Sequence, residues 1–280
     1  MKQLFCPTDF SKASQSAVEY AAALAVASDA HLRLAHFYEI PALYSDAPLT
    51  AIHDAVGQLA SLAQSKITRI EKRLKKKYPG LRMDHLISQG IGSQSIVEAA
   101  ESIGADMIVM GATGAGRVKR LLIGSTAAKV LRHAHCSVII VPAGRQFKGL
   151  PRIGFATDLN EDNLQAAAAL VPFAKAFDSE LDFVFVDDRH MLHTDESVDR
   201  MTKRIRSRIN YPSICGYLVT DTDVVKGIRS FLKKRKCDLM VLYTHERNFP
   251  ETLFHSSVTR LVSEQASLPV LSLKVADRPV

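Results

Sequence analysis

The sequence predicts an α/β fold made of two doubly wound domains in tandem. Short apolar runs alternate with helical patterns along the chain, the whole pattern occurs twice, and 280 residues suit two domains of ordinary size. Alternating strands and helices imply right-handed crossovers and an open parallel sheet.

The first copy contains five predicted strands, near residues 2–7, 31–37, 82–88, 105–110 and 136–141. The first, fourth and fifth are nearly continuous apolar runs, which is typical of parallel strands buried on both faces. Helices are predicted from Ser14 to Ala27 and from Ser93 to Ile103. A helix of about seven turns is predicted after the second strand.

The second copy repeats these elements at two offsets. LFCPTDFSKASQSAVEYAAALA resembles IGFATDLNEDNLQAAAALVPFA, so Thr8-Asp9 corresponds to Thr157-Asp158 at an offset of 149. Further on, ADMIVMGATG matches CDLMVLYTHE at an offset of 132. The second copy is therefore 17 residues shorter, and we place the loss in the long helix after the second strand.

The boundary between the copies is predicted in the short segment from Gly144 to Gly149, which carries glycine and lysine. This division gives a first domain of residues 1–146 and a second of residues 147–280. Each is long enough to bury its own core.

Composition indicates a globular protein, with 47% hydrophobic and 23% charged residues. The apolar stretch at the N-terminus is too short for a signal peptide or a membrane span, so we expect a cytoplasmic protein without a membrane partner. Four cysteines are scattered without a CxxC pair, which favours buried free thiols over a metal site or disulfides.

The formal net charge is +7, and much of it lies in Lys72–Lys77 and Lys233–Lys236. Both runs end predicted helices, where cations suit the helix dipole and the solvent. Among aromatic residues only Tyr78 adjoins them, so nucleic acid is an unlikely partner.

The segment MGATGAGRVKRLLIGSTAAKV, residues 110–130, concentrates four glycines and several cations between an apolar strand and a helix start. Glycine lets backbone N–H groups approach phosphate oxygens, and Gly124-Ser125-Thr126 begins a helix whose free N–H groups attract anions. Arg117 adds positive charge. The alternatives are a nucleotide-phosphate cradle and a plain surface turn.

A second candidate segment is Pro7-Thr8-Asp9, directly after the first strand. If the first and fourth strands are neighbours, this segment and Gly111 face one crevice at the carboxyl ends of the strands. Asp9 then suits ribose hydroxyls or the adenine edge. The chain contains neither GxxxxGK[ST] nor the compact GxGxxG fingerprint.

Taken together, these motifs resemble the universal stress protein family. They are PTDFS after the first strand, Gly111-x2-Gly114-x9-Gly124-Ser125 after the fourth, and KVLRHA before SVIIVP. The resemblance covers the chain as two tandem domains and is strongest in residues 1–145. It implies Rossmann-like five-stranded parallel sheets of order 3-2-1-4-5 and an ATP-binding first domain.

The resemblance also implies the residues that hold ATP, with or without Mg²⁺. By position, and with their immediate neighbours, these are Pro7, Thr8, Asp9, Phe37, Met110, Gly111, Gly114, Arg117, Gly124, Ser125 and Thr126. Phe37 stands where a smaller aliphatic residue is usual, so it could stack on the adenine or crowd it.

The second copy departs from the pattern. Tyr243 stands in place of Gly111, Glu246 in place of Gly114, and Ser256 in place of Gly124. A carboxylate would repel phosphates, and side chains would occupy the backbone's approach to them. We therefore expect no ATP binding of the same kind in the second domain.

An apolar edge strand is a pairing liability, and the family resolves it by pairing fifth strands across a dimer. Here Ser137–Val141 could pair with Val270–Leu273 of the same chain. We expect an intrachain pseudo-dimer and leave further homodimerisation open.

The sequence thus favours a stress-response protein that binds ATP in its first domain and acts as a nucleotide-dependent sensor or regulator. No Ser-His-Asp arrangement, clear general base or metal-ligand set is found, so no catalytic or metal residue is assigned. The alternatives are a scaffold that binds no nucleotide and a slow ATP hydrolase.

Overall fold

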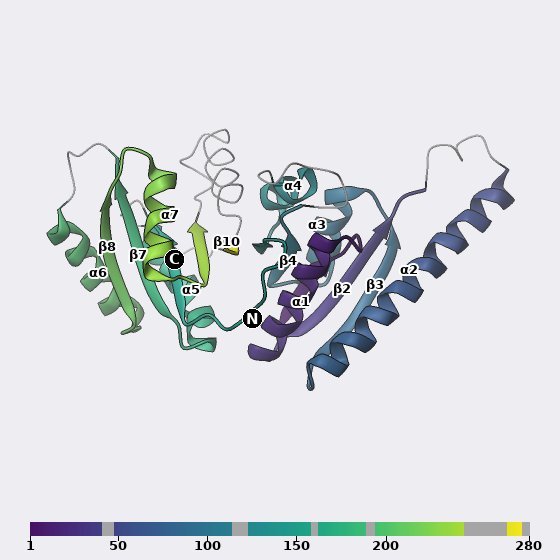
Figure 1. The fold of residues 1–280 in the computed structure, drawn as a ribbon, viewed down its shortest axis with the longest axis horizontal. Coiled ribbons are helices and arrows are strands. Elements are labelled where there is room, and N and C mark those ends of the chain that lie inside the picture. The colour runs from purple at the N-terminus through teal and green to yellow at the C-terminus, as the bar shows by residue number, and fades with distance from the viewer. Residues whose placement is uncertain (41–47, 114–122, 158–161, 189–193, 244–267, 276–280) are drawn as a thin grey trace.

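The computed structural model describes residues 1–40, 48–113, 123–157, 162–188, 194–243 and 268–275. Their strands form one ten-stranded sheet of order β3-β2-β1-β4-β5-β10-β9-β6-β7-β8. Figure 1 shows the two halves side by side, each with helices packed on its part of the sheet.

The elements of the first half are β1 (Gln3–Pro7), α1 (Lys12–Ala27), β2 (His31–Tyr38), α2 (Leu49–Lys77), β3 (Arg82–Gln89), α3 (Gly92–Ser102), β4 (Met107–Gly111), α4 (Ser125–His133) and β5 (Ser137–Val141). The elements of the second half are β6 (Arg152–Ala156), α5 (Asp162–Ala176), β7 (Glu180–Asp187), α6 (Asp195–Ile209), β8 (Ile214–Thr220), α7 (Val224–Arg235), β9 (Leu239–Tyr243) and β10 (Val270–Leu273).

The predicted fold class is confirmed. The first half has the strand order β3-β2-β1-β4-β5 and the second the equivalent order β8-β7-β6-β9-β10. All pairings within a half are parallel. The five strands predicted for the first half lie within two residues of the observed bounds, because continuous apolar runs mark strands buried on both faces.

The two halves differ most between their second and third strands. Here the first half has α2, a helix of 29 residues, and the second has α6, a helix of 15 residues. None of the helices in the described ranges is both long enough and apolar enough to cross a membrane.

The halves meet at an antiparallel strand pair. β10 pairs with β5 in the register Val270↔Ile140, Leu271↔Ile139 and Ser272↔Val138. The Ser137 hydroxyl also accepts a hydrogen bond from the backbone N–H of Lys274, at 3.1 Å. Each fifth strand therefore covers the edge that the other would expose.

Two hydrophobic layers sandwich the sheet. Leu4 and Cys6 of β1 belong to the layer that α1, α2, α5 and α6 cover, whereas Phe5 belongs to the layer beneath α3, α4 and α7. This division follows from the alternation of side chains along a strand. Both layers contain residues of both halves, so the core continues across the β5–β10 junction.

The segment between the halves packs closely on the first one. The backbone N–H of Gly144 donates to the Ser16 hydroxyl of α1 at 2.9 Å. The ring of Phe147 lies between Tyr20 and Phe177, with ring centroids 5.2 and 5.8 Å away. An aromatic chain therefore leads from α1 into the second half.

All four cysteines are free, and Cys6 and Cys237 are buried as expected. Cys136 and Cys215 are only half-buried, so the prediction of buried thiols was wrong for these two: Cys136 directly precedes β5, and Cys215 is the second residue of β8, an edge strand of the sheet. Burial raises the pKa of Cys136 to about 11 and that of Cys237 to about 12. These two thiols are thus neutral and weakly nucleophilic at pH 7.

A charged network lies at the amino-terminal ends of the second-half strands. Arg235, at the end of α7, donates to both carboxylate oxygens of Asp182 at 2.9 and 3.2 Å and to Glu180 at 2.9 Å. The Asp182 side chain is fully buried. Burial raises the pKa of this carboxyl, and the Arg235 hydrogen bond acts in the opposite direction.

Close packing also joins β4 to α1. A Cβ placed on Gly111, at the end of β4, would lie 3.0 Å from the carbonyl oxygen of Ala13 and 3.3 Å from the backbone nitrogen of Ser14. Both neighbours are backbone atoms of the first turn of α1. The absence of a side chain at Gly111 is therefore what lets α1 begin so close to β4.

Replacing Arg235 should expose the cost of a buried carboxylate that loses both of its close hydrogen bonds and keeps Arg152, 3.8 Å away, as its charged partner among the described residues. We expect Arg235→Met to lower the free energy of unfolding by about 3 kcal/mol, measured by urea denaturation at pH 7. The matched control is Arg82→Met, whose partner Asp29 is almost fully exposed, and which should cost less than about 1 kcal/mol. Equal losses in the two variants would contradict this account of the network.

A methyl group at Gly111 should push α1 away from β4. We expect Gly111→Ala to cost about 1–3 kcal/mol in a thermal or urea melt. Gly57 in α2 is the control, because a Cβ there meets no atom within 4 Å. Gly57→Ala should stabilise the protein by roughly 0.5–1 kcal/mol. If Gly111→Ala also stabilised it, the close approach would be disproved.

Candidate functional site

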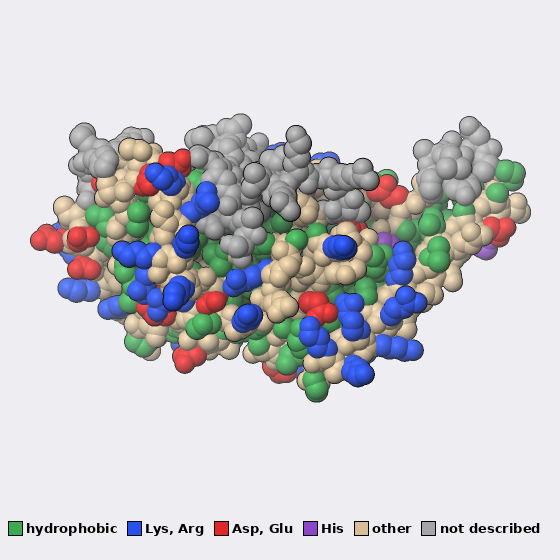
Figure 2. Space-filling view, in the orientation of Figure 1, with side chains coloured by type: hydrophobic (Ala, Val, Ile, Leu, Met, Phe, Trp, Pro, Cys, Tyr) green, Lys and Arg blue, Asp and Glu red, His purple; other side chains and the backbone are tan. Residues whose placement is uncertain are grey.

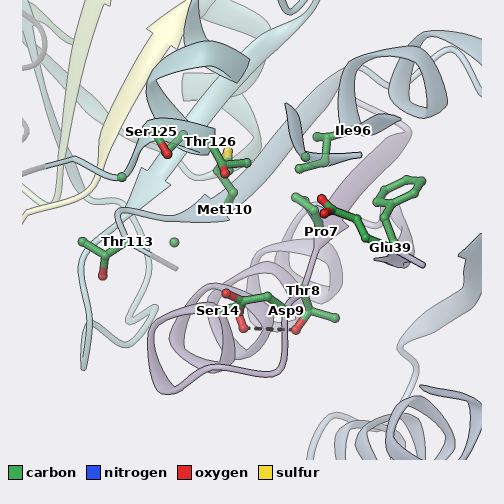
Figure 3. A pocket seen from close by; sticks show the side chains of 15 residues that line it. Pro7, Thr8, Asp9, Ser14, Glu39, Ile96, Met110, Thr113, Ser125 and Thr126 are labelled. Carbon is green, nitrogen blue, oxygen red and sulfur yellow. Dashed lines mark hydrogen bonds between the residues drawn. The ribbon is translucent and has the colours of Figure 1, made fainter. Parts of the chain in front are cut away.

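A cavity of about 300 Å³ opens where the strand order of the first half reverses. From β1 the chain crosses to β2 on one side, whereas β4 lies on the other side of β1. The loops that leave β1 and β4 therefore diverge and leave a crevice at their carboxyl ends, the usual ligand position in such sheets. Figure 3 shows the side chains around this cavity.

One end of the cavity is formed by the start of α4. Gly124 is the N-cap residue, no side chain of the described residues caps the helix, and Ser125, Thr126 and Ala127 of the first turn line the cavity. The first N–H groups of a helix have no partner within it and carry its positive dipole end. The hydroxyls of Ser125 and Thr126 are exposed and add hydrogen-bonding groups.

A fixed turn after β1 forms the lower side of the cavity in Figure 3. The Thr8 hydroxyl contacts the Ser14 hydroxyl at 3.1 Å, drawn as the dashed line, and accepts from the backbone N–H of Phe10 at 3.1 Å. A carboxylate oxygen of Asp9 accepts from the backbone N–H of Ser11 at 3.0 Å. Phe10 itself has a left-handed φ of 63°. The turn thus holds the exposed Asp9 carboxylate at the cavity.

The opposite end is apolar, with one carboxylate. Pro7, Phe37 and Ile96 line it, and Pro7 and Ile96 are buried. Met110, which is also buried, lies beside Thr126 at the α4 end (Figure 3). Figure 3 shows Glu39 beside Pro7, across the cavity from Ser125 and Thr126. The cavity therefore has an electropositive end at α4 and an apolar end that carries Glu39.

Nine of the eleven residues predicted for the site line this one cavity: Pro7, Thr8, Asp9, Phe37, Met110, Gly111, Gly124, Ser125 and Thr126. The other two, Gly114 and Arg117, lie outside the described residues. Packing also explains why residue 111 is a glycine, because a side chain there would collide with the start of α1.

Six lining residues were not predicted: Ser14, Glu39, Gly92, Ile96, Thr113 and Ala127. Thr113 and Ala127 lie in the glycine-spaced segment, so local sequence could have suggested them. Gly92 begins α3, which places a second uncapped helix start at the cavity. Glu39 and Ile96 reach it only through the position of β2 and the packing of α3, which no local pattern reveals.

In the second half, Tyr243 ends β9 where Gly111 ends β4, and its ring packs partly buried against the core. Asp158, Glu246 and Ser256 lie outside the described residues. The comparison of the two halves at this point therefore rests on Tyr243, which carries a large side chain where Gly111 has none and where the start of α1 fills the space in the first half.

The sequence matches known proteins over its first half. Residues 1–142 match the universal stress protein family, which is just over half of the chain. A universal stress protein from Methanocaldococcus jannaschii is 29% identical over 140 residues, covering 50% of this chain and 81% of that protein. One from Thermus aquaticus is 33% identical over 140 residues, covering 50% of this chain and 98% of that protein.

The fold likeness extends over both halves. A universal stress protein from Archaeoglobus fulgidus superposes with a TM-score of 0.69 at 17% identity, covering 98% of this chain and 97% of that chain. A Pseudomonas aeruginosa protein of unknown function gives a TM-score of 0.62 at 14% identity, covering 99% and 94%. At such identities the likeness shows the fold alone. On the match of residues 1–142, the chain belongs to the universal stress protein family.

Proposed function

We propose that this stress protein binds ATP in the cavity of its first half and acts as a nucleotide-dependent sensor or regulator. The observation that carries the proposal is the start of α4, where no side chain of the described residues caps the helix and which lies across one cavity from an apolar end that carries Glu39. Such an arrangement suits a ligand with phosphates at one end and a base at the other.

The phosphates would lie at α4. The N–H groups of its first turn, with the Ser125 and Thr126 hydroxyls, offer donors to phosphate oxygens. Charge-assisted hydrogen bonds of this kind contribute roughly 1.5–3 kcal/mol each. Gly114 and Arg117, which belong to the same glycine-spaced segment, are proposed to complete this end.

The adenosine would lie against Pro7, Phe37 and Ile96, where apolar side chains can cover the base. The Asp9 carboxylate accepts hydrogen bonds and suits the ribose hydroxyls. Because phosphates repel carboxylates, Asp9 and Glu39 favour a ligand whose anionic part lies toward α4. A Mg²⁺ ion on the phosphates fits this donor set, since it prefers oxygen ligands.

These residues suit ATP binding better than rapid ATP hydrolysis. Among the described lining residues there is no histidine or lysine that could act as a general base, and Asp9 is engaged by the backbone of its own turn. Slow hydrolysis stays the alternative, with Asp9 as the residue to test. A scaffold that binds no nucleotide is the other alternative.

We further propose that the chain is divided at residues 146 and 147 into two domains that form an intrachain pseudo-dimer. The antiparallel β5–β10 pair supports this, because it joins equivalent strands of the two halves. It also occupies the β5 edge, so any homodimer would need another surface. With Tyr243 in place of Gly111, the second domain is proposed to lack ATP binding of this kind.

A carboxylate in the first turn of α4 should prevent ATP binding while leaving the helix intact. Glutamate suits a helix N-terminus, so Thr126→Glu should keep the fold, yet it would repel phosphates. For the wild type, ATP at about a hundred times its Kd should add roughly 2.7 kcal/mol to the domain that binds it. We expect Thr126→Glu to lose this increase in a thermal melt with Mg·ATP.

The matched control is Thr50→Glu, which makes the same exposed substitution in the first turn of α2, away from the cavity. It should keep the full ATP-dependent increase. An increase of wild-type size in Thr126→Glu, or none in the wild type, would refute the proposed phosphate position.

A further inference from the structure

A second cavity, of about 430 Å³, lies between α1, the end of α2 and the segment that joins the halves. It shares no lining residue with the first cavity. We call it the basic groove; its lining residues are Lys12, Gln15, Ser16, Glu19, Arg73, Lys77, Tyr78, Gly144, Arg145, Gln146 and Phe147. Figure 2 shows Lys and Arg side chains gathered over the lower end of α2, beside this groove.

The groove carries a surplus of positive charge. Lys12, Arg73, Lys77 and Arg145 line it, against Glu19 as the one carboxylate among its described lining residues. These cations come from three separate segments of the chain, so the fold rather than the local sequence gathers them. The four cations and one carboxylate give the lining a net charge of +3.

Glu19 fixes two of these cations in place. Its carboxylate accepts from Lys77 at 2.6 Å and from the Tyr78 hydroxyl at 3.2 Å, and it pairs with Arg73 at 3.2 Å. The hydrogen bond to Glu19 raises the pKa of Lys77 above its ordinary value. One partly buried carboxylate therefore orients two cations at the groove.

The other two cations are poorly compensated. Lys12 is the first residue of α1, whose first turn holds no acidic residue, so its charge lies at the positive end of the helix dipole. Arg145 pairs with Asp238 only at 3.8 Å, and its buried Nε has no hydrogen-bond partner among the described residues. An anion bound in the groove would offset the charge of Lys12 and of the Arg145 guanidinium group.

We propose that the basic groove binds a phosphate chain, either inorganic polyphosphate or the polyphosphate part of a nucleotide. Several cations spread along one groove match a linear anion with a charge on each unit better than a single carboxylate, and arginine pairs well with phosphate oxygens. Because Gly144–Phe147 form one wall, the ligand would connect α1 and α2 to the segment that joins the halves.

The test is a calorimetric titration of the full chain with inorganic tripolyphosphate at fixed ionic strength. We expect the double variant Lys12→Gln/Arg145→Gln to bind at least about tenfold more weakly than the wild type. The matched control, Lys72→Gln/Lys75→Gln, removes the same charge from exposed positions of α2 that do not line the groove. It should change the affinity less than about twofold.

The Thr126→Glu variant distinguishes the groove from the ATP cavity, since Thr126 lines only the cavity. The affinity of the groove for tripolyphosphate should be the same in this variant as in the wild type, whether or not the cavity binds ATP. Lys12→Gln alone changes one exposed side chain, and its weaker binding with an unchanged melt would rule out misfolding as the cause. Equal weakening by both double variants, or loss of binding in Thr126→Glu, would overturn the proposal.

Competition identifies the source of the phosphate chain. The competition is measured in the Thr126→Glu protein, with tripolyphosphate bound and ATP added. If ATP displaces tripolyphosphate at a similar concentration, the groove binds nucleotides. Retention of tripolyphosphate against excess ATP would assign it to inorganic polyphosphate.

Discussion

The reversal of strand order between β1 and β4 is the constraint on which the site depends. It makes the chain leave the two central strands in opposite directions, so a crevice must open at their carboxyl ends. The same geometry brings the starts of α1, α3 and α4 to one place, since each helix follows a strand at that edge. Gly111 then lets α1 begin close to β4 at this edge of the sheet.

The second half shows what happens when that arrangement loses its small residue. It keeps the strand order and the two core layers, yet Tyr243 stands at the end of β9. The second half also contains β10, which covers the edge of β5, and the Asp182–Arg235 network at the amino-terminal ends of its strands. The two halves thus share a fold while they differ at the end of the fourth strand, where the first has Gly111 and the second Tyr243.

The sequence predicted the fold well because its strongest signals are local. Nearly continuous apolar runs marked β1, β4 and β5, and the repeat located their counterparts in the second half. Most of the predicted cavity residues lie at the carboxyl ends of β1 and β4 or at the start of α4, the helix that follows β4, and Phe37 lies near the end of β2. Glu39 and Ile96 were missed because only the register of β2 and the packing of α3 bring them there.

The basic run at the end of α2 illustrates the same limit. The sequence indicated cations that suit a helix end and the solvent, and the α2 bounds agree with that position. It did not reveal that Arg73 and Lys77 pair with Glu19, because this partner lies far back along the chain in α1. Contacts between distant segments decide which charges gather, and no short pattern encodes them.

The most direct test of the account is a calorimetric titration of the intact chain with Mg·ATP, read for stoichiometry. We expect one ATP per chain in the first-half cavity, and we expect Thr126→Glu to lose this ATP, whereas any binding in the basic groove should persist. No binding would contradict the proposed function. Two equivalent sites, one in each half, would contradict the proposal that Tyr243 and its neighbours leave the second half without this activity.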